Sequence, residues 1–429
     1  MSEAAPRIPD DIARLLVDPA AHADGRIHEG HTWLRANMPL GIAQVEGYDP
    51  FWAVTRHADI LDISKRNTVF GNAERSVSLV NAETERLVRE LTGGSGNFIR
   101  MLIHMDAPDH MKYRLLTQNW FMPANIRKLE DDIRRLARRT VDKMARYGGR
   151  CDFANDIALG YPLHVIMSIL GVPEEDEPRM LALTQDLFGR DDPDKARGGV
   201  SAGSDPAAYV AMVQGIIDDF SGYFAKISAA RRADPRDDLA TVIANAQVAG
   251  EPISDLDAMS YYMIVATAGH DTTSASSAGA IWGMAENPAE FARAKADPAL
   301  IPALVDEAIR WTTPVRSFMR AAREDAEVNG QDIPAGAWLK LCYMSGNRDE
   351  AVFDDPAAFR LDRSPNKHLA FGYGAHLCLG QHLAKMEMRI LFEELLPRLK
   401  SLELDGAPAS NKALGVGGVK TLPIRFELN

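Results

Sequence analysis

The sequence predicts a mainly α-helical protein with a small β region, built as a single domain over residues 1–429. Helical periodicity dominates the chain, whereas the strand-like runs are short and stand beside turn residues. No segment has the composition of an inter-domain linker, and no internal repeat is visible. With 46% hydrophobic and 25% charged residues, the chain has an ordinary globular composition and enough length for a large core.

The helices are predicted where apolar residues recur every three or four positions with charges between them. They are expected at residues 126–147, 176–187, 209–231, 255–286, 301–311 and 379–399. The strands are predicted from short apolar runs, several of them next to turn signals such as Asn329-Gly330. They are expected at residues 52–54, 326–328, 338–341 and 422–426. Residues 196–206 (ARGGVSAGSDP) are expected to form a flexible loop within the domain.

Charge and cysteine usage exclude several classes of protein. The formal net charge of −12 argues against nucleic acid or an anionic membrane as the main partner, because both require clustered positive charge. The three cysteines are far apart, so a disulfide framework is not expected and a reducing cytoplasm fits. The first 30 residues lack the apolar core of a signal peptide, and the apolar stretch 259–284 is interrupted by ionisable and hydroxyl side chains. We therefore expect a soluble, cytoplasmic protein.

The segment 371–380 (FGYGAHLCLG) is the most informative part of the sequence. Its glycines permit a tight loop, which places Cys378 at the start of the helix expected at 379–399. The free N–H groups and positive dipole end of a helix stabilise a thiolate. Phe371 would pack beside the sulfur, and Gly380 would let the helix approach a flat ligand closely. A buried structural cysteine is the simpler alternative.

A zinc site is a second alternative for the same segment, with His376, Cys378 and His382 as ligands. It lacks the second cysteine pair or the HExxH helix that zinc sites usually contain.

Residues 268–273 (AGHDTT) are a poor helix sequence in the middle of a predicted helix, because glycine and adjacent threonines both lower helix stability. A tolerated glycine in a long buried helix would be the plain explanation. The functional explanation is that Thr272 turns its hydroxyl to the carbonyl of Ala268, four residues earlier, and opens a notch in the helix. Gly269 would then leave room for a small molecule.

Two charged pairs share helix faces. Glu307 and Arg310 are three residues apart, and such a pair is usually an exposed ion pair of little energetic value. His110 and Arg114 are four residues apart and carry like charge when the histidine is protonated, which destabilises an isolated helix unless both bind one anion.

The pattern FxxGxHxCxG at 371–380 resembles the haem-binding loop of the cytochrome P-450 superfamily. The resemblance implies the cytochrome P-450 fold and haem b (iron protoporphyrin IX), with Cys378 as the thiolate ligand of the iron. It places Phe371, Gly374, Gly380 and Ala268 next to the haem. Residues 268–272 resemble the family's AGxDT motif, which implies that Asp271 and Thr272 deliver protons during oxygen activation.

The two charged pairs also match family motifs. Glu307 and Arg310 resemble the ExxR structural pair, completed by a downstream basic residue for which Arg363 is the candidate, and the trio would brace the cysteine loop. His110 and Arg114 resemble the HxxxR motif that binds a haem propionate. The other propionate donors implied by the resemblance are Arg320 and His376.

The resemblance extends over nearly the whole chain and is strongest to soluble bacterial monoterpene hydroxylases, in particular the terpineol-oxidising type. It is carried by residues 46–52 (EGYDPFW), 119–130, 161–165, 266–274 and 380–388. The expected pocket segments match less well. Residues 77–98 should form a loop over the substrate, and residues 196–206 should lie near the access lid. Residues 411–419, the expected last turn of the pocket, also depart from the terpineol pattern. The residues expected to face the substrate are Phe98, Ile264, Thr267, Ala268, Val315, Phe318 and Val416.

The resemblance implies a monooxygenase that uses O2 to hydroxylate a small apolar substrate, such as a monoterpenoid or an alkyl-substituted aromatic. The chain has no GxGxxG fingerprint of its own, so electrons are expected from a 2Fe–2S ferredoxin with an NAD(P)H-dependent reductase. The candidate basic docking residues are Lys112, Arg127, Lys128, Arg134 and Arg135. A haem-binding sensor or carrier without turnover is the alternative function.

Overall fold

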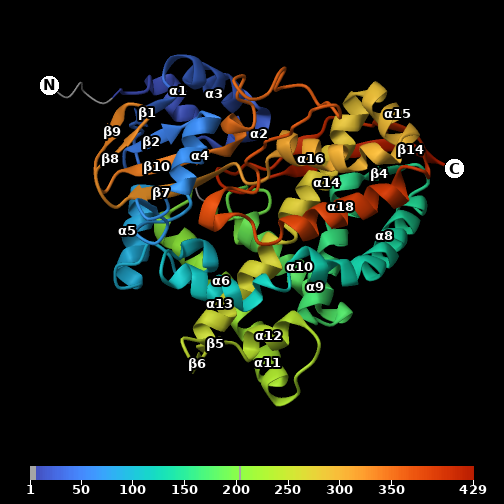
Figure 1. Ribbon diagram of the computed structural model, residues 1–429, viewed down its shortest axis with the longest axis horizontal. Coiled ribbons are helices and arrows are strands. Elements are labelled where there is room, and N and C mark those ends of the chain that lie inside the picture. Colours follow the sequence, from blue (N-terminus) through green and yellow to red (C-terminus); the bar gives the residue numbers. More distant parts are fainter. Residues whose placement is uncertain (1–5, 202–203) are drawn as a thin grey trace.

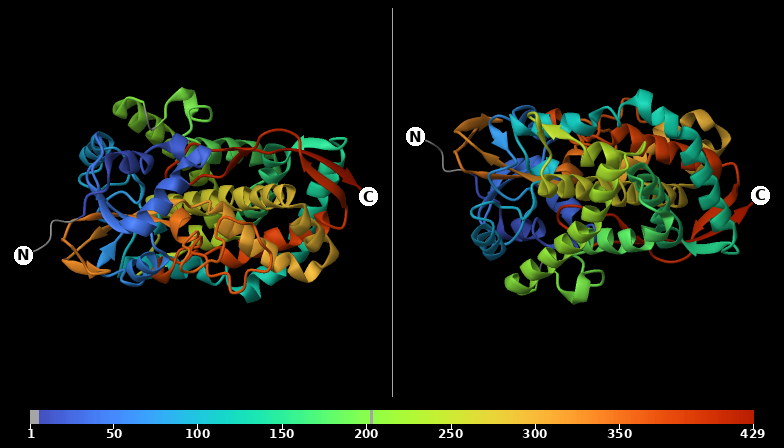
Figure 2. Two further views of the ribbon diagram at one scale, coloured as in Figure 1. Left: turned by 90° about the horizontal axis from the view of Figure 1, so that it is seen from above. Right: turned by 90° about the horizontal axis from the view of Figure 1, so that it is seen from below.

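The computed structural model describes residues 6–201 and 204–429. In Figure 1 most of the strands gather around the N-terminal helices at one end of the molecule, whereas β4 and β14 lie at the opposite end beside the C-terminus, and helices make up most of the remainder. The mainly α class with a small β region is therefore confirmed. Helices α13 and α14 run through the middle of the body in all three views (Figures 1 and 2).

The main sheet has the strand order β1-β2-β10-β7-β3. Its strands are β1 (Leu40–Ala43), β2 (Phe51–Val54), β10 (Trp338–Cys342), β7 (Ser317–Ala322) and β3 (Phe70–Gly71). β10 pairs in parallel with β2 and antiparallel with β7, so the sequence-distant segments 51–54 and 317–342 form one unit. The hairpin of β8 (Ala326–Val328) and β9 (Gln331–Ile333) turns through Asn329 and Gly330, both with positive φ, as a two-residue hairpin turn requires.

Small residues let the central helices pack closely. The buried face of α14 (Asp271–Glu286) is rich in alanine, serine and glycine and packs against α16 (Ile301–Thr312). A Cβ on Gly283 would lie 2.6 Å from the ring of Phe359, so only glycine fits this contact. α18 (Gln381–Leu395) packs against α16 on one side and against α8 (Glu130–Ala145) on another. Their apolar residues belong to one large core cluster.

The remaining elements surround this core. The helices are α1 (Asp10–Leu15), α2 (Pro19–Asp24), α3 (Arg26–Asn37), α4 (His57–Lys65), α5 (Ala82–Leu91), α6 (Asp109–Gln118), α7 (Pro123–Ile126), α9 (Gly160–Leu170), α10 (Glu177–Phe188), α11 (Pro206–Ala233), α12 (Leu239–Ala244), α13 (Asp255–Ala268), α15 (Pro288–Ala296) and α17 (Tyr343–Gly346). The short helical turns are η1 (Leu102–His104), η2 (Arg127–Leu129), η3 (Phe153–Ala158), η4 (Glu174–Asp176), η5 (Arg197–Gly199), η6 (Pro298–Leu300) and η7 (Gly374–His376). The small sheets are formed by β4 (Arg150–Asp152), β11 (Leu399–Leu404) and β14 (Pro423–Leu428), by β5 (Gln247–Val248) and β6 (Glu251–Pro252), and by β12 (Ala409–Ser410) and β13 (Val419–Thr421).

The predicted elements are all present, and the differences have local causes. The helix expected at 255–286 is two helices, α13 and α14, separated at Gly269 and His270. The helix expected at 379–399 ends at Leu395, because the chain turns there into β11. The helix expected at 126–147 starts as the short turns α7 and η2 before α8.

The two segments expected to be loops contain more structure than predicted. Residues 77–98 include the helix α5, whose first turn is capped by the Asn81 side chain accepting from Thr84 N. In the segment 196–206, η5 forms at Arg197–Gly199 and α11 begins at Pro206, while residues 202–203 lie outside the described part of the chain.

Within the described ranges, one helical stretch is long and apolar enough to cross a membrane. It is Phe153–Leu170, and 67% of it is buried inside the protein. This is how the core helix of a globular protein is placed, so the stretch is weak evidence for a membrane span.

Candidate active site

A cavity of about 490 Å³ lies between the central helices, the main sheet and the loop that carries Cys378. Its volume is in the range of small-molecule sites. The residues of three predicted groups line it together. They are Cys378, Phe371 and Gly380; His110, Arg114, Arg320 and His376; and Phe98, Ile264, Thr267, Ala268, Thr272, Val315, Phe318 and Val416.

The cysteine loop is held in a tight conformation at the wall of this cavity. The Cys378 N–H donates to the carbonyl of Phe371 at 2.9 Å, which closes the loop. Gly374 has a φ of +72°, and a Cβ there would collide with the carbonyl of Ser64 in α4, so glycine is required. Gly374 therefore shapes the loop and does not line the cavity. A Cβ on Gly380 would meet no atom within 4 Å and would point into free space beside the cavity wall, as expected for a flat ligand at this wall.

The surroundings of the Cys378 sulfur act on its protonation in opposite directions. Burial raises the pKa of the thiol, and this effect is the largest. The backbone N–H groups of Gly380 and Gln381 and the charge of Arg114 favour the thiolate. The helix N-terminus thus favours the thiolate, as expected, while desolvation acts against it with the larger effect. A bound cation would supply the missing charge, since a metal-ligating thiol is deprotonated.

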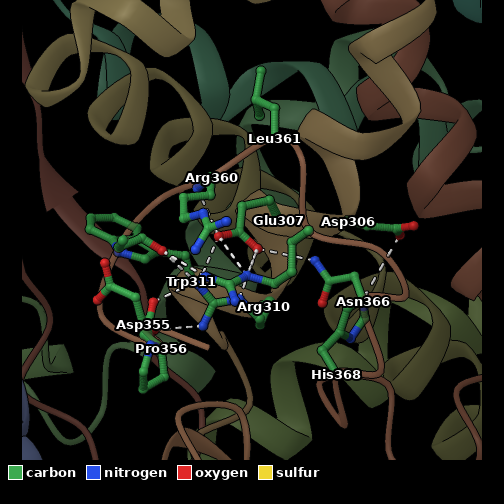
Figure 3. Close-up of polar contacts among 12 residues, drawn as sticks. Asp306, Glu307, Arg310, Trp311, Asp355, Pro356, Arg360, Leu361, Asn366 and His368 are labelled. Atoms are coloured by element: carbon green, nitrogen blue, oxygen red, sulfur yellow. Dashed lines mark hydrogen bonds and ion pairs between the residues drawn. The ribbon is translucent and has the colours of Figure 1, made fainter. Parts of the chain in front are cut away.

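Buried charges brace the loop from behind (Figure 3). The Arg310 guanidinium donates to Glu307 at 2.7 and 2.8 Å, and both side chains are at most 1% exposed. Arg363 adds a second cation 3.2 Å from Glu307, and the Asn366 amide donates to the same carboxylate at 3.0 Å. The structure thus brings together the three residues of the predicted trio, in a fully buried cluster and not as a surface pair.

This cluster of Glu307, Arg310, Arg363 and Asn366, called the brace below, is connected to the cysteine loop through hydrogen bonds to backbone carbonyls. Arg310 donates to the carbonyls of Asn347, Pro356 and Ala358. The Asn347 side chain then accepts from Leu369 N at 2.6 Å, two residues before Phe371. The chain that leads to the cysteine is therefore fixed by a network that begins in α16.

Four basic side chains, His110, Arg114, Arg320 and His376, gather on one side of the cavity, where the Asp106 carboxylate lies 3.8 Å from His376 Nε2. The rings of His110 and His376 have centroids 4.3 Å apart, and the Nε2 atoms of both are buried without a hydrogen-bond partner among the described residues. The pKa of His110 falls to about 4, because burial, His376 and Arg114 all disfavour its protonation. Arg114 and Arg320 line the same cavity. Two carboxylates would satisfy these groups, and haem offers two propionates, so the donor set fits haem.

The break between α13 and α14 forms the predicted notch. The Thr272 hydroxyl donates to the carbonyl of Ala268 at 2.9 Å, as expected, and thereby replaces the missing backbone ladder. Gly269 and Thr272 line the cavity. Asp271 does not line it: its carboxylate lies on the other side of the break, where it accepts from the Gln185 amide at 2.6 Å.

Sequence reasoning missed much of the cavity roof, by which we mean the lining residues from 77–98, 187–201 and 206–217. Its apolar members are Val77, Leu79, Val80, Val88, Leu187, Val210, Val213 and Ile217. Thr84 and Val88 are four apart on α5, so the N-cap signal at Asn81 could have identified this helix. Arg190, Asp191 and Tyr209 also line the roof, and no local sequence signal indicates that they meet.

The zinc alternative is not supported by side-chain placement. His382 is exposed on α18, while the His376 ring faces His110 and Asp106. Over residues 6–201 and 204–429, no group of three or more His, Cys, Asp or Glu side chains converges on one point.

The predicted basic docking residues are largely neutralised. Arg134 pairs with Glu130, Glu393 and Glu394, the last two from α18. Arg135 pairs with Asp132, and Lys112 pairs with Asp109. Arg127 and Lys128 are exposed on η2. Of the five candidates, these two carry charge that is most available to a partner.

Comparison with known proteins agrees with this site. The family model for cytochrome P450 matches residues 296–426, which contain the ExxR pair and the cysteine loop. The chain is 51% identical to cytochrome P450-terp from Pseudomonas sp. over 98% of both proteins. The crystal structure of CYP108D1 from Novosphingobium aromaticivorans superposes with a TM-score of 0.91 at 44% identity, covering 99% of this chain and 100% of that one.

A more distant relative has the same fold. CYP268A2 from Mycobacterium marinum, solved in complex with pseudoionone, superposes with a TM-score of 0.86 at 30% identity over 99% of this chain and 100% of that one. These findings replace the alternatives of a zinc protein and of a haem carrier or sensor. The chain belongs to the cytochrome P450 family and is a haem-dependent P450 monooxygenase.

Proposed function

We propose that this monooxygenase hydroxylates a small apolar molecule, a monoterpenoid or an alkyl-substituted aromatic compound. The observation that carries the proposal is the apolar lining of the cavity between Cys378 and the helix notch. Phe98, Ile264, Val315 and Val416 come from four separate parts of the chain and face one compact space. The name of the relative cytochrome P450-terp agrees with a terpene-sized substrate.

The cofactor in this proposal is haem b. When bound, it supplies the oxygen activation and C–H oxidation that no amino-acid side chain provides. Cys378 holds the iron, and His110, Arg114, Arg320 and His376 hold the propionates. The whole chain acts as one catalytic domain, because the groups that surround the cavity come from residues 19 to 416.

Thr272 and Asp271 have the proton-handling roles. The Thr272 hydroxyl faces the cavity and donates to Ala268 O at rest, so a small rotation turns its proton toward the cavity. Asp271 is adjacent and supplies the replacement proton from the outer side of the break. We expect Thr272→Ala to lower product formation by about 10²-fold, with the consumed electrons released as peroxide and substrate affinity nearly unchanged. Unchanged coupling of electron use to product would remove this role.

The redox partner in this proposal is a 2Fe–2S ferredoxin with its NAD(P)H-dependent reductase, in the cytoplasm. Arg127 and Lys128 are the basic residues with free exposure near α6, whereas Arg134 and Arg135 are occupied by acidic side chains. Charge reversal at Arg127 should slow reduction and flatten its salt dependence. The same change at Arg135 should have the smaller effect, and equal effects would argue against this assignment.

The substrate class is tested by spectral titration of the haem-loaded protein. Monoterpenes and alkylbenzenes should displace the water on the iron and shift the haem to high spin at micromolar concentration. Long-chain fatty acids and steroids should not do so. A high-spin shift with steroids and none with monoterpenes would overturn the proposed substrate class.

A further inference from the structure

His270 stands at the break between α13 and α14, and the proposed mechanism does not use it. Its side chain is completely buried. Its Nε2 lies 2.8 Å from the carbonyl of Leu159, the residue between η3 and α9. Its Nδ1 lies 3.2 Å from the Thr184 hydroxyl and 3.4 Å from Asp271 Oδ2. The ring thus connects three helices to the carboxylate of the proton relay.

The contact with Leu159 fixes the position of one proton on the ring. A carbonyl oxygen can only accept, so Nε2 must carry hydrogen. Nδ1 is then an acceptor when the ring is neutral and a donor when it is charged.

Thr184 is compatible with both states of the ring. Its hydroxyl lies 3.0 Å from the carbonyl of Leu181 as well as 3.2 Å from Nδ1. It can donate to Nδ1 while the ring is neutral, or donate to Leu181 O and accept from Nδ1–H while the ring is charged. Neither state leaves the buried Nδ1 without a partner.

The carboxylate of Asp271 is held at two points. Oδ1 accepts from the Gln185 amide at 2.6 Å. Oδ2 is buried, has no hydrogen bond within the described part of the chain, and faces His270 Nδ1. Lys195 also acts on this carboxylate at longer range. Burial lowers the pKa of His270, but the Asp271 charge and the Leu159 carbonyl raise it, and the net change is upward. The Asp271 carboxylate therefore favours protonation of the His270 ring.

This arrangement keeps the carboxylate away from the notch. Thr272 and Gly269 line the cavity, whereas Asp271, which lies between them in the sequence, does not. To exchange a proton with Thr272, the Asp271 side chain has to leave Gln185 and His270. Because His270 has no exposed surface, it cannot itself carry protons from solvent.

We propose that His270 is a positioning residue that, together with Gln185, holds the ionised Asp271 carboxylate on the outer side of the helix break between proton deliveries. The inference rests on the proton role proposed above for Asp271. It predicts that His270 controls when Asp271 reaches the notch, and that substrate binding does not depend on it.

The test compares His270→Phe, which keeps the ring volume and removes both nitrogens, with His270→Gln, which keeps an N–H donor. Ser277→Ala is the control, because Ser277 is equally buried on α14. In the haem-loaded enzyme, His270→Phe should lower the product formed per electron pair by about tenfold, within the cost of misplacing a catalytic group. The pH dependence of kcat should change as well, because the ring nitrogen that lies 3.4 Å from the Asp271 carboxylate is removed. His270→Gln should recover part of both effects, and substrate affinity should not change.

Asp271→Asn separates the two proposals. If Asp271→Asn uncouples the enzyme and His270→Phe leaves coupling and pH profile as in the wild type, the role of His270 is wrong. If Asp271→Asn itself has no effect, the proposed proton role fails first. The double variant His270→Phe/Asp271→Asn should be no worse than Asp271→Asn, because both changes act on one carboxylate. Additive losses, or equal losses in Ser277→Ala, would show that His270 only supports the fold.

Discussion

On the cysteine side of the cavity, Glu307 and Arg310 pair where water does not reach, while near the roof Lys420 pairs with Asp194, whose side chain is 67% exposed. The cysteine side adds Arg363 and Asn366 to the same buried carboxylate. The roof has pairs of both kinds: Arg75 pairs with the exposed Asp49 and also with Glu85, which is buried.

The difference follows from what each region has to do. A buried ion cluster is costly to build and costly to break, so it defines one conformation of the loop that holds the metal ligand. Exposed pairs contribute at most about 1 kcal/mol each, so the exposed contacts of the roof add little to the stability of the fold. In Figure 2 the green segment that includes the start of α11 projects from the body of the molecule.

The largest effect on stability is expected when the central carboxylate of the brace is removed, which tests whether the buried cluster is more important for stability than the exposed pairs. Glu307→Ala leaves Arg310 and Arg363 buried without a partner, and we expect it to lower the free energy of unfolding by about 3–5 kcal/mol. Chemical denaturation and haem content measure the effect. Glu427→Ala, which removes an exposed partner of Lys400, is the matched control and should cost less than about 1 kcal/mol. Equal losses in the two variants would mean that burial of the brace is unimportant.

On the roof, changes should affect binding more than stability. Phe98→Ala removes apolar surface from the cavity wall and should weaken substrate binding by about 1.5–3 kcal/mol, or roughly tenfold to a hundredfold. The free energy of unfolding should fall less than in Glu307→Ala. Leu91→Ala, on the exposed end of α5, should leave binding unchanged. Spectral titration gives both affinities, and equal affinities for all three proteins would show that Phe98 does not contact the substrate.

His104, which lines the cavity, should make the free energy of unfolding depend on pH. Burial lowers its pKa to about 4, although the Ile99 carbonyl accepts from Nδ1 and opposes the shift. Because the pKa is lower in the folded than in the unfolded chain, where it is about 6.5, the stability that His104 contributes is complete above pH 6.5. It is lost as the pH falls from 6.5 toward 4, by up to about 1.4 kcal/mol per pH unit.

The check is denaturant unfolding across this pH range. His104→Gln should have a shallower loss of stability between pH 6.5 and 4 than the wild type, because one fewer proton is taken up on unfolding. Parallel pH curves would mean that His104 is already protonated in the folded protein.

The smallest effect on stability is expected for Asp194, the exposed partner of Lys420. Asp194→Asn removes one of two carboxylates from Lys420, whose contact with buried Asp192 at 2.9 Å remains. We expect a loss of about 0.2–1 kcal/mol in stability and a modestly faster substrate release. Stopped-flow displacement measures the release rate, and a change as large as that of Phe98→Ala would show that this pair closes the roof.

The cysteine side could be predicted from the sequence because its signals are local. The loop 371–380 contains its own glycines and cysteine, and Glu307 and Arg310 are one helical turn apart. The break at residues 268–272 was also visible, because Thr272 and Ala268 are separated by one turn. What the sequence did not indicate is the burial of the brace, which depends on Asn347 and residues 354–366 folding over α16.

The roof could be predicted only in outline. Arg190, Asp191 and Tyr209 come from two segments whose meeting depends on tertiary packing, so no period or motif indicates it. The same holds for the basic docking residues: Arg134 is neutralised by Glu393 and Glu394, which are more than 250 positions later in the chain. Charge counts along the sequence cannot show such pairing.

The most direct test is the spectrum of the reduced haem-loaded protein with carbon monoxide, in wild type and in Cys378→His. We expect the wild type to give the red-shifted band of a thiolate-bound haem, and the variant to give the band of a histidine-bound globin. A wild-type spectrum of the globin kind, or protein that stays colourless after haem is supplied, would contradict the central claim that Cys378 is the ligand of the iron.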